Sequence, residues 1–377
     1  MNHIKLLLFL LLIILYSCGQ KGTDDLKQTF SYQLDTVLID SKGKNLDLNR
    51  NITNSDLNVE ESTIYLFNSF DHSIDEINLD QLEYVQSIPL EKEGPNGTSS
   101  IFYIYSLNDE LFFIKGYEKS GVFDKNGRLL KNAQWSKVKN GDGFQTLKNE
   151  LVLEYSDSMK VFGIAYGLER SIYLDVLSTK NLTKKRFDID LEKAYQNNVL
   201  ELDDSGIYIF LEPELHLNAE NGLALVSHGF TNEIYIFNAA GEFVKKVSYE
   251  PTLTPKSVKQ IDKNGIVSRE ILENTYQGFL EQVKFGAPVW DKLNKRYLRL
   301  SAQRVFTDTK AENAFLPQTK KYKIFLTVFD EDFNLISEGE VPEFNSESVK
   351  YFAKDGKLWY FTNVDDELGF VILNLEN

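Results

Sequence analysis

A strand-turn-strand unit recurs along this chain, and it constrains the fold more than any other feature of the sequence. In each copy, a strand rich in apolar and aromatic residues ends at a polar turn and a second strand follows. The turns fall at Asp80, Asp124, Thr179, Asn238, Asp330 and Asn374. Apart from the longer interval between Asn238 and Asp330, their spacing is near the ~40–50 residue period of a propeller blade. The repeat therefore predicts an all-β chain, a six-bladed β-propeller.

Short alternating runs of apolar and polar residues predict the strands of each copy. The first three copies place strands at residues 64–68, 74–79 and 84–90, at 110–115, 121–123 and 128–130, and at 151–155, 172–177 and 185–189. The last three place them at 223–226, 234–237 and 243–247, at 297–300, 324–329 and 335–341, and at 358–361 and 370–373.

The sixth copy ends before its outermost strand, whereas residues 29–39 form a strand-like run with no partner in the first copy. Pairing this N-terminal strand into the last blade would close the ring and cover an open sheet edge. A seven-bladed ring is the alternative, because residues 290–294 can be counted as a further turn. We interpret them as the inner hairpin of the fifth blade, since the strand at 297–300 follows at once.

One insertion, at about residues 250–285, interrupts the repeat and has helical character. Within 268–282, apolar side chains recur at helix spacing, and Ser268 can serve as the N-cap. Those side chains are Ile271, Leu272, Tyr276, Phe279 and Leu280. Insertions in repeat folds often map to a binding face, so Tyr276 and Phe279 are candidates for a partner surface. The alternative is that the helix only covers a blade.

The N-terminus reads as an export signal that ends at Cys18, the only cysteine. Lys5 precedes an apolar run from Leu6 to Leu15, which is too short to span a bilayer, since about 20 residues are needed. It resembles the lipobox of bacterial lipoproteins, in which the chain is cut before the cysteine and the cysteine is acylated. The expected parts are a signal peptide at 1–17, a flexible tether at 18–27 and a single propeller domain at 28–377.

Nearly all of the mature chain resembles the TolB-like six-bladed propeller lipoproteins of Gram-negative bacteria. The loop at residues 94–97 and the stretch from Trp290 to Arg299 are similar to an uncharacterised lipoprotein family of this kind, which implies no particular activity. The lipobox resemblance implies a lipid-anchored protein of the outer membrane, because Gly19 rather than Asp follows the cysteine. The sequence leaves open whether it faces the periplasm or the cell surface.

Composition and motifs favour recognition over catalysis. The net charge of −15 argues against a nucleic-acid partner, because phosphate binding needs a basic patch. No nucleophile elbow or phosphate-binding loop occurs, so no catalytic residue and no cofactor are predicted. His216 and His228 flank one hairpin, but a metal site with Glu214 is less favoured than ordinary histidine roles.

We therefore expect a lipid-anchored binding or assembly module of the cell envelope, with the membrane as one partner and an envelope protein or glycan as another. The alternative is a propeller hydrolase or lyase that acts on glycans or peptides.

Overall fold

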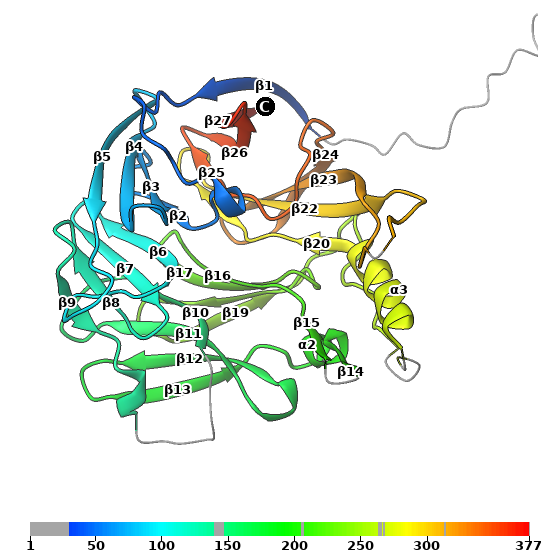
Figure 1. The fold of residues 1–377 in the computed structure, drawn as a ribbon, viewed down its shortest axis with the longest axis horizontal. Helices are drawn as coiled ribbons and strands as arrows, with labels where there is room; N and C mark the ends of the chain where they lie inside the picture. The colour runs from blue at the N-terminus through cyan, green and yellow to red at the C-terminus, as the bar shows by residue number, and fades with distance from the viewer. Residues whose placement is uncertain are drawn as a thin grey trace, which may run out of the picture.

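The computed structural model describes residues 30–138, 147–204, 207–262, 266, 268–312 and 314–376. These residues form six antiparallel sheets that are the blades of a six-bladed β-propeller (Figure 1). The prediction of six blades is confirmed. The residues that suggested a seventh blade instead begin within β21 (Val289–Asp291), which pairs with β22 (Arg296–Phe306) in blade five.

Blades one to four each run from an innermost to an outermost strand in chain order. Blade one holds β2 (Ser55–Leu57), β3 (Thr63–Asn68), β4 (Ser73–Asn78) and β5 (Glu83–Pro89). Blade two holds β6 (Ile101–Asn108), β7 (Leu111–Gly116), β8 (Ser120–Asp124) and β9 (Leu129–Asn132). Blade three holds β10 (Leu147–Val152), β11 (Lys160–Tyr166), β12 (Ile172–Ser178) and β13 (Thr183–Asp188). Blade four holds β16 (Leu215–Glu220), β17 (Leu223–His228), β18 (Ile234–Phe237) and β19 (Phe243–Val247).

Blades five and six depart from that simple order. In blade five, β20 (Val283–Phe285) and β21 both pair with the long strand β22, and β23 (Thr319–Asp330) and β24 (Leu335–Glu340) follow. In blade six, β25 (Tyr351–Lys354), β26 (Lys357–Val364) and β27 (Glu367–Glu376) are completed by β1 (Ser31–Leu38).

The N-terminal strand closes the ring, as the sequence predicted. β1 pairs with β27 in antiparallel register from Ser31 opposite Glu376 to Leu38 opposite Gly369, and the two strands lie side by side in Figure 1. The chain then reaches the outer edge of blade one, where Tyr84 donates its backbone N–H to the Asp40 carbonyl at 2.9 Å. The first residues of the fold thus join the last blade to the first.

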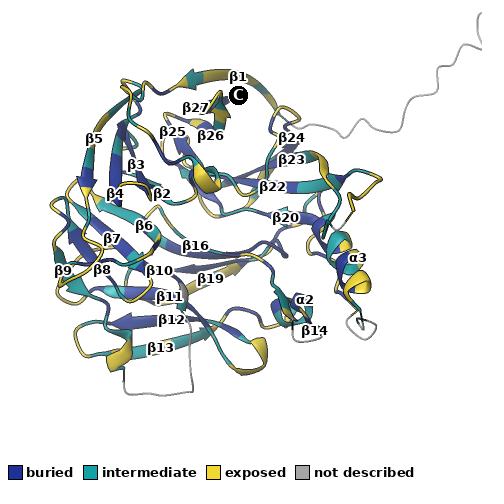
Figure 2. Ribbon diagram, viewed as in Figure 1, coloured by how far each residue is buried: buried dark blue, intermediate teal, exposed yellow. Residues whose placement is uncertain are grey.

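The core lies between the blades and is formed mainly by their middle strands. All six residues of β3 are buried, whereas the outermost strands β13 and β19 alternate or are largely exposed. Figure 2 shows this contrast between buried β12 and the more accessible β13. The alternation follows from the pleat, because successive side chains of a strand point to opposite faces of its sheet.

Blade three differs from the sequence-based assignment. Residues 151–155 were expected to form its second strand, but Leu151 and Val152 end the innermost strand β10, and the second strand is β11. The run in β11 contains Gly163, a residue depleted in strands. A side chain there would come within 3.1 Å of the Trp135 ring, so the close approach of that ring explains the glycine.

Two insertions leave the blade pattern, where the sequence predicted one. Helix α3 (Arg269–Leu280) lies in the predicted insertion, and the Ser268 side chain caps it by accepting the Ile271 N–H at 3.3 Å. The second insertion follows blade three and holds helix α2 (Ala194–Asn198) and a hairpin of β14 (Leu200–Asp204) and β15 (Ile207–Leu211). Helix α3 contacts β14, and both insertions lie on the same side of the ring in Figure 1.

The remaining helical segments are short 3-10 turns at Asn49–Ile52, Trp135–Lys137 and Leu168–Arg170. No helix in the described part of the chain has the length and apolar character to cross a membrane.

Candidate functional site

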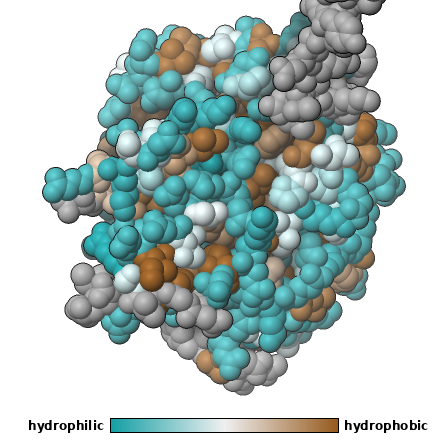
Figure 3. All heavy atoms as spheres, turned by 90° about the vertical axis from the view of Figure 1, so that its right-hand side faces the viewer, coloured by the Kyte–Doolittle hydropathy of each residue, from teal (hydrophilic) through white to brown (hydrophobic). Residues whose placement is uncertain are grey.

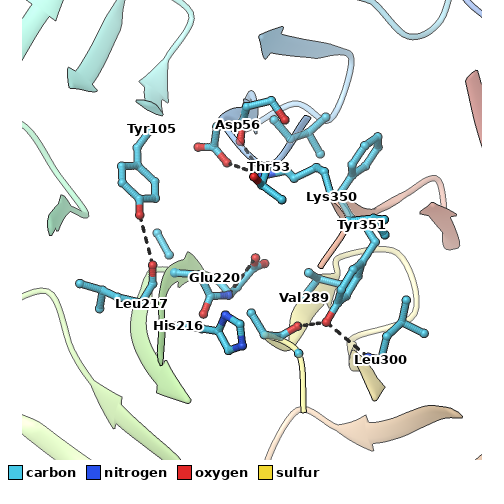
Figure 4. Close-up of a pocket in the computed structure, with 18 of the residues that line it drawn as sticks. Thr53, Asp56, Tyr105, His216, Leu217, Glu220, Val289, Leu300, Lys350 and Tyr351 are labelled. Carbon is cyan, nitrogen blue, oxygen red and sulfur yellow. Dashed lines mark hydrogen bonds and ion pairs between the residues drawn. The ribbon is translucent and has the colours of Figure 1, made fainter. Parts of the chain in front are cut away.

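A central channel is the main hollow of the described structure. The innermost strands of the six blades surround a cavity of about 1100 Å³, which is lined by residues from all six. Figure 4 looks into this space and shows side chains from separate blades that converge on it. A concave cavity of this size with a few converging polar groups is the usual form of a small-molecule site.

The innermost strands all begin at one face of the ring, because each blade has the same antiparallel order of strands. At this face, called the entry face below, Lys284 lies 3.5 Å from Glu347, and Glu347 also pairs with Arg304. The Glu214 carboxylate accepts a hydrogen bond from the Ser348 hydroxyl at 3.3 Å. Charged groups of both signs therefore surround the channel entrance.

A strained turn of the backbone lies at the entry face. Arg50, Asn51 and Ile52 have successive φ values of 55°, 52° and 51°, a left-handed turn built from residues that are not glycine. Such conformations cost on the order of 1–3 kcal/mol each and cluster at functional sites. The Lys350 N–H donates to the Asn51 carbonyl at 3.2 Å, and the Ile52 side chain is buried. The turn keeps the exposed side chain of Arg50 on the channel wall.

Two hydrogen-bonded groups tie blades together deeper in the channel. Lys350 donates to the Ser55 carbonyl at 2.8 Å and lies 3.4 Å from the Asp56 carboxylate, so blade six is joined to blade one. The Tyr351 hydroxyl donates to the Ala287 carbonyl and accepts the Leu300 N–H at 3.3 Å, which joins blade six to blade five (Figure 4).

Glu220 occupies the middle of the channel in Figure 4, at the end of β16. One carboxylate oxygen accepts the Trp290 backbone N–H at 2.8 Å, and the other accepts the Asn218 side-chain amide at 3.3 Å. Burial raises the pKa of Glu220 to about 7, although the Trp290 hydrogen bond opposes this. The negative charge of Asp56 raises that pKa further, and the positive charge of Lys350 lowers it. Glu220 can therefore exist in either protonation state near neutral pH.

The residues proposed for a partner surface lie close to the entry face. Phe279 is buried and Tyr276 is partly buried, with ring centroids 6.5 Å apart, and Tyr276 also lies 6.2 Å from the Phe315 ring. The Glu214 and Arg304 charges of the entry face both act on the pKa of Tyr276, which burial raises. The burial of Phe279 favours the alternative that this face of α3 covers the fold. Ile271, expected on the same apolar side, is exposed.

Figure 3 views the side of the molecule on which the insertions lie. Its surface is mostly hydrophilic, with hydrophobic side chains in separate small groups.

The remaining sequence candidates take other roles or fall outside the described residues. Cys18 lies outside them. The His216 imidazole lies 3.1 Å from the Phe285 carbonyl, and burial lowers its pKa. His228 stacks on Phe230 with ring centroids 4.7 Å apart, and burial lowers its pKa to about 3. No group of three or more metal-ligating residues occurs in the described parts of the chain.

Sequence reasoning did not single out Asp56, Glu220 or Lys350. A signal was available in principle, because each lies on or just before an innermost strand of a repeat whose spacing was recognised. For Asp56 the strand β2 is only three residues long, too short for an alternating pattern to reveal which side chains face the channel. Glu220 and Lys350 lie at the end of β16 and just before β25, where the pattern of the strand stops.

Comparisons with known proteins agree with the fold. A family model described as a domain of unknown function (DUF4221) matches residues 27–340. A solved member of that family from Bacteroides vulgatus has a TM-score of 0.64 and 12% sequence identity, with 93% of this chain and 98% of that chain covered. A putative exported protein from Bacteroides fragilis has a TM-score of 0.45 and 10% identity, with 91% and 96% covered. No curated protein matches the sequence.

Proposed function

This chain belongs to the DUF4221 family, a domain of unknown function, and we propose from its channel that it is a binding module of the cell envelope. The observation that carries the proposal is the cavity of about 1100 Å³, into which all six blades place polar or charged residues. Polar and charged side chains that face a cavity can form hydrogen bonds and ion pairs with a ligand, and they fix its orientation there. The ligand we propose is therefore small and polar.

The strained turn at Arg50–Ile52 supports the same proposal. Backbone strain persists only where the surrounding structure over-determines it, and two of the three strained residues, Arg50 and Asn51, line the channel. The turn orients a cationic side chain at the entrance, where burial raises the pKa of Tyr103, the Glu214 charge raises it further and the Arg50 charge lowers it. This arrangement fits a selective entrance for a polar ligand.

A channel-filling variant tests the proposal. Ala219 lies on β16, lines the channel and has an exposed side chain, so Ala219→Trp should fill part of the cavity without disturbing the core. We expect any small polar metabolite that stabilises the wild-type protein in a thermal-shift screen to bind at least about tenfold more weakly to this variant. Ala240→Trp, in the exposed turn of blade four, is the matched control and should bind normally. Equal binding by both variants would place the ligand outside the channel.

We also propose that Cys18 is acylated and holds the module at the outer membrane, on the strength of the lipobox-like signal. We expect Cys18→Ser either to release the protein into the soluble periplasmic fraction or to leave it uncleaved, as judged by fractionation and by the mass of the product. A Ser variant that is still cleaved after residue 17 and still requires detergent for extraction would contradict the anchor.

A hydrolase or lyase is the second candidate function, and one observation favours it. Burial raises the pKa of Glu220 to about 7, and Asp56 lines the same cavity. A carboxyl group whose pKa lies near the working pH is suited to act as a general acid or base. Recovery of the bound ligand decides between the candidates, because a binding module returns it unchanged and an enzyme returns it cleaved.

A further inference from the structure

The charges of the channel are not equally compensated. The cations that lie within it already have partners: Lys350 pairs with Asp56, and Lys284 shares the Glu347 carboxylate with Arg304. Arg50 and Lys292 are exposed to solvent. Glu220, by contrast, has no basic group within 4.0 Å among the residues that the structure describes. In its ionised form it is an anion held by two hydrogen bonds, and the nearest positive charge that acts on it, that of Lys350, is paired with Asp56.

The hydrogen bonds to Glu220 leave room for a further donor. A carboxylate has about four lone-pair sites, and the Trp290 N–H and the Asn218 amide use two of them. Glu220 is half-buried, and its side chain points into the open space of Figure 4. An incoming cation could therefore bind Glu220 without breaking a bond that the protein already makes.

Aromatic residues on the channel wall suit the same kind of ligand. Tyr103, Tyr105, Trp290 and Tyr351 all line the cavity. Aromatic faces attract ammonium groups, and the attraction strengthens when water is excluded. The net charge of −15 adds a field that concentrates cations and repels anions around the protein. Charge compensation, open acceptor sites and the overall field all favour a cation over an anion.

We infer that the channel, in the binding role proposed above, recognises a ligand through a protonated amine that lies against the Glu220 carboxylate. The inference rests on the proposed function and goes beyond it by naming the chemical group that is recognised. The rest of the ligand occupies the cavity toward the entry face.

The groups that face Glu220 determine how the binding of an amine to this carboxylate depends on pH. They are Asp56 on β2, Lys350 and Tyr351 at the start of β25, and Tyr297 on β22. Tyr297 and Tyr351 remain neutral because burial raises their pKa values, so Glu220 is the group of this set that titrates near pH 7. Because the amine binds the ionised carboxylate, affinity should rise with pH by up to about tenfold per unit below pH 7 and level off above it.

The test uses the full-length protein in detergent and three probes of similar shape: benzylamine, benzyl alcohol and benzoate. Affinities are measured by saturation-transfer NMR from pH 5.5 to 8.5. Glu220→Gln is the diagnostic variant, because its amide oxygen can still accept the Trp290 N–H while the charge is lost. Glu118→Gln, at an exposed site outside the channel, is the matched control. Thermal melts verify that both variants are folded.

We expect benzylamine to bind the wild type more tightly than either other probe, and Glu220→Gln to weaken it about tenfold or more at pH 8, as loss of a charge-assisted hydrogen bond does. The variant should also lose the rise in affinity between pH 5.5 and 7, and Glu118→Gln should retain it. The inference is overturned if benzylamine does not bind, if Glu220→Gln binds it as the wild type does, or if benzoate binds more tightly.

The proposal that the channel binds a ligand and the inference that it recognises an amine can be refuted separately. If polar metabolites that lack an amine bind and Ala219→Trp blocks them, the channel is the binding site and the amine inference is wrong. If no metabolite that binds is sensitive to Ala219→Trp, the channel proposal itself is wrong.

Discussion

Deletion of residues 26–40 should open the propeller ring and prevent stable folding. This segment contains β1, which supplies the outer strand of blade six, and Asp40, which bonds to the outer edge of blade one. Its loss exposes the whole edge of β27, and an unpaired edge of that kind is prone to aggregation.

The apolar side chains of the segment make the effect large. Ile39 is buried, Phe30, Tyr32 and Leu34 are partly buried against blades five and six, and Val37 is partly buried against blades six and one. Full burial of one such side chain contributes about 1.5–3 kcal/mol, so together they contribute on the order of 5 kcal/mol. Proteins of this kind have a total stability of about 5–15 kcal/mol. Urea unfolding followed by circular dichroism, with size-exclusion chromatography for aggregation, measures the loss.

Deletion of residues 19–25, predicted from the sequence to be a tether, is the control for this experiment. It should leave the unfolding midpoint unchanged. If the two deletions are tolerated equally, β1 does not contribute to the stability of the ring.

Replacement of Arg299 should destabilise the fold strongly, although it removes only one side chain. Arg299 is fully buried in β22, and no carboxylate is within 4.0 Å among the residues described. Its guanidinium instead donates to three backbone carbonyls: Gly286 at 2.8 Å, Asn232 at 3.0 Å and His228 at 3.2 Å. The side chain thereby connects the β17–β18 loop of blade four to the break between β20 and β21 in blade five.

We expect Arg299→Met to lower the free energy of unfolding by about 3 kcal/mol, measured by urea unfolding. Each carbonyl left without a partner costs about 1–3 kcal/mol, and removal of a buried charge offsets part of that cost. Arg299→Lys should cost about 2 kcal/mol, because an ammonium cannot reproduce the planar fork of the guanidinium.

Arg128→Met provides the surface control for these variants. Arg128 is exposed and forms a salt bridge to Asp124 at 3.0 Å, and exposed pairs contribute about 0–1 kcal/mol. An Arg299→Met variant as stable as wild type would show that the cost of burying the charge equals the energy of its three hydrogen bonds.

The blades and their closure were predictable from the sequence because they depend on local patterns. A strand of blade four such as β18 is a short run of apolar and aromatic residues that ends in a polar turn, and so it can be recognised without its neighbours. The closing strand was predictable by elimination, since 29–39 had no partner in the first copy and the last copy lacked a strand. Helix α3 was predictable from its periodicity and from Ser268.

The second insertion and the blade-three strands were less predictable. The sequence from β14 to β15 has the pattern of two ordinary strands. They are not part of a blade only because they pair with each other and not with blade three or blade four. Tyr276 and Phe279 show a related limit. Their helical spacing identified the apolar face of α3, but not whether a partner or the protein itself covers it.

The candidate site could not be predicted from the sequence, because most of the contacts that define it join different repeats. Lys350 and Asp56 are separated by 294 residues along the chain, and Glu220 and Trp290 by 70. The blade repeat determines that their strands line a ring. Which of their charges meet across that ring, and which carboxylate is left without a salt bridge, is decided only when six blades close and bring the innermost strands within hydrogen-bond distance of one another.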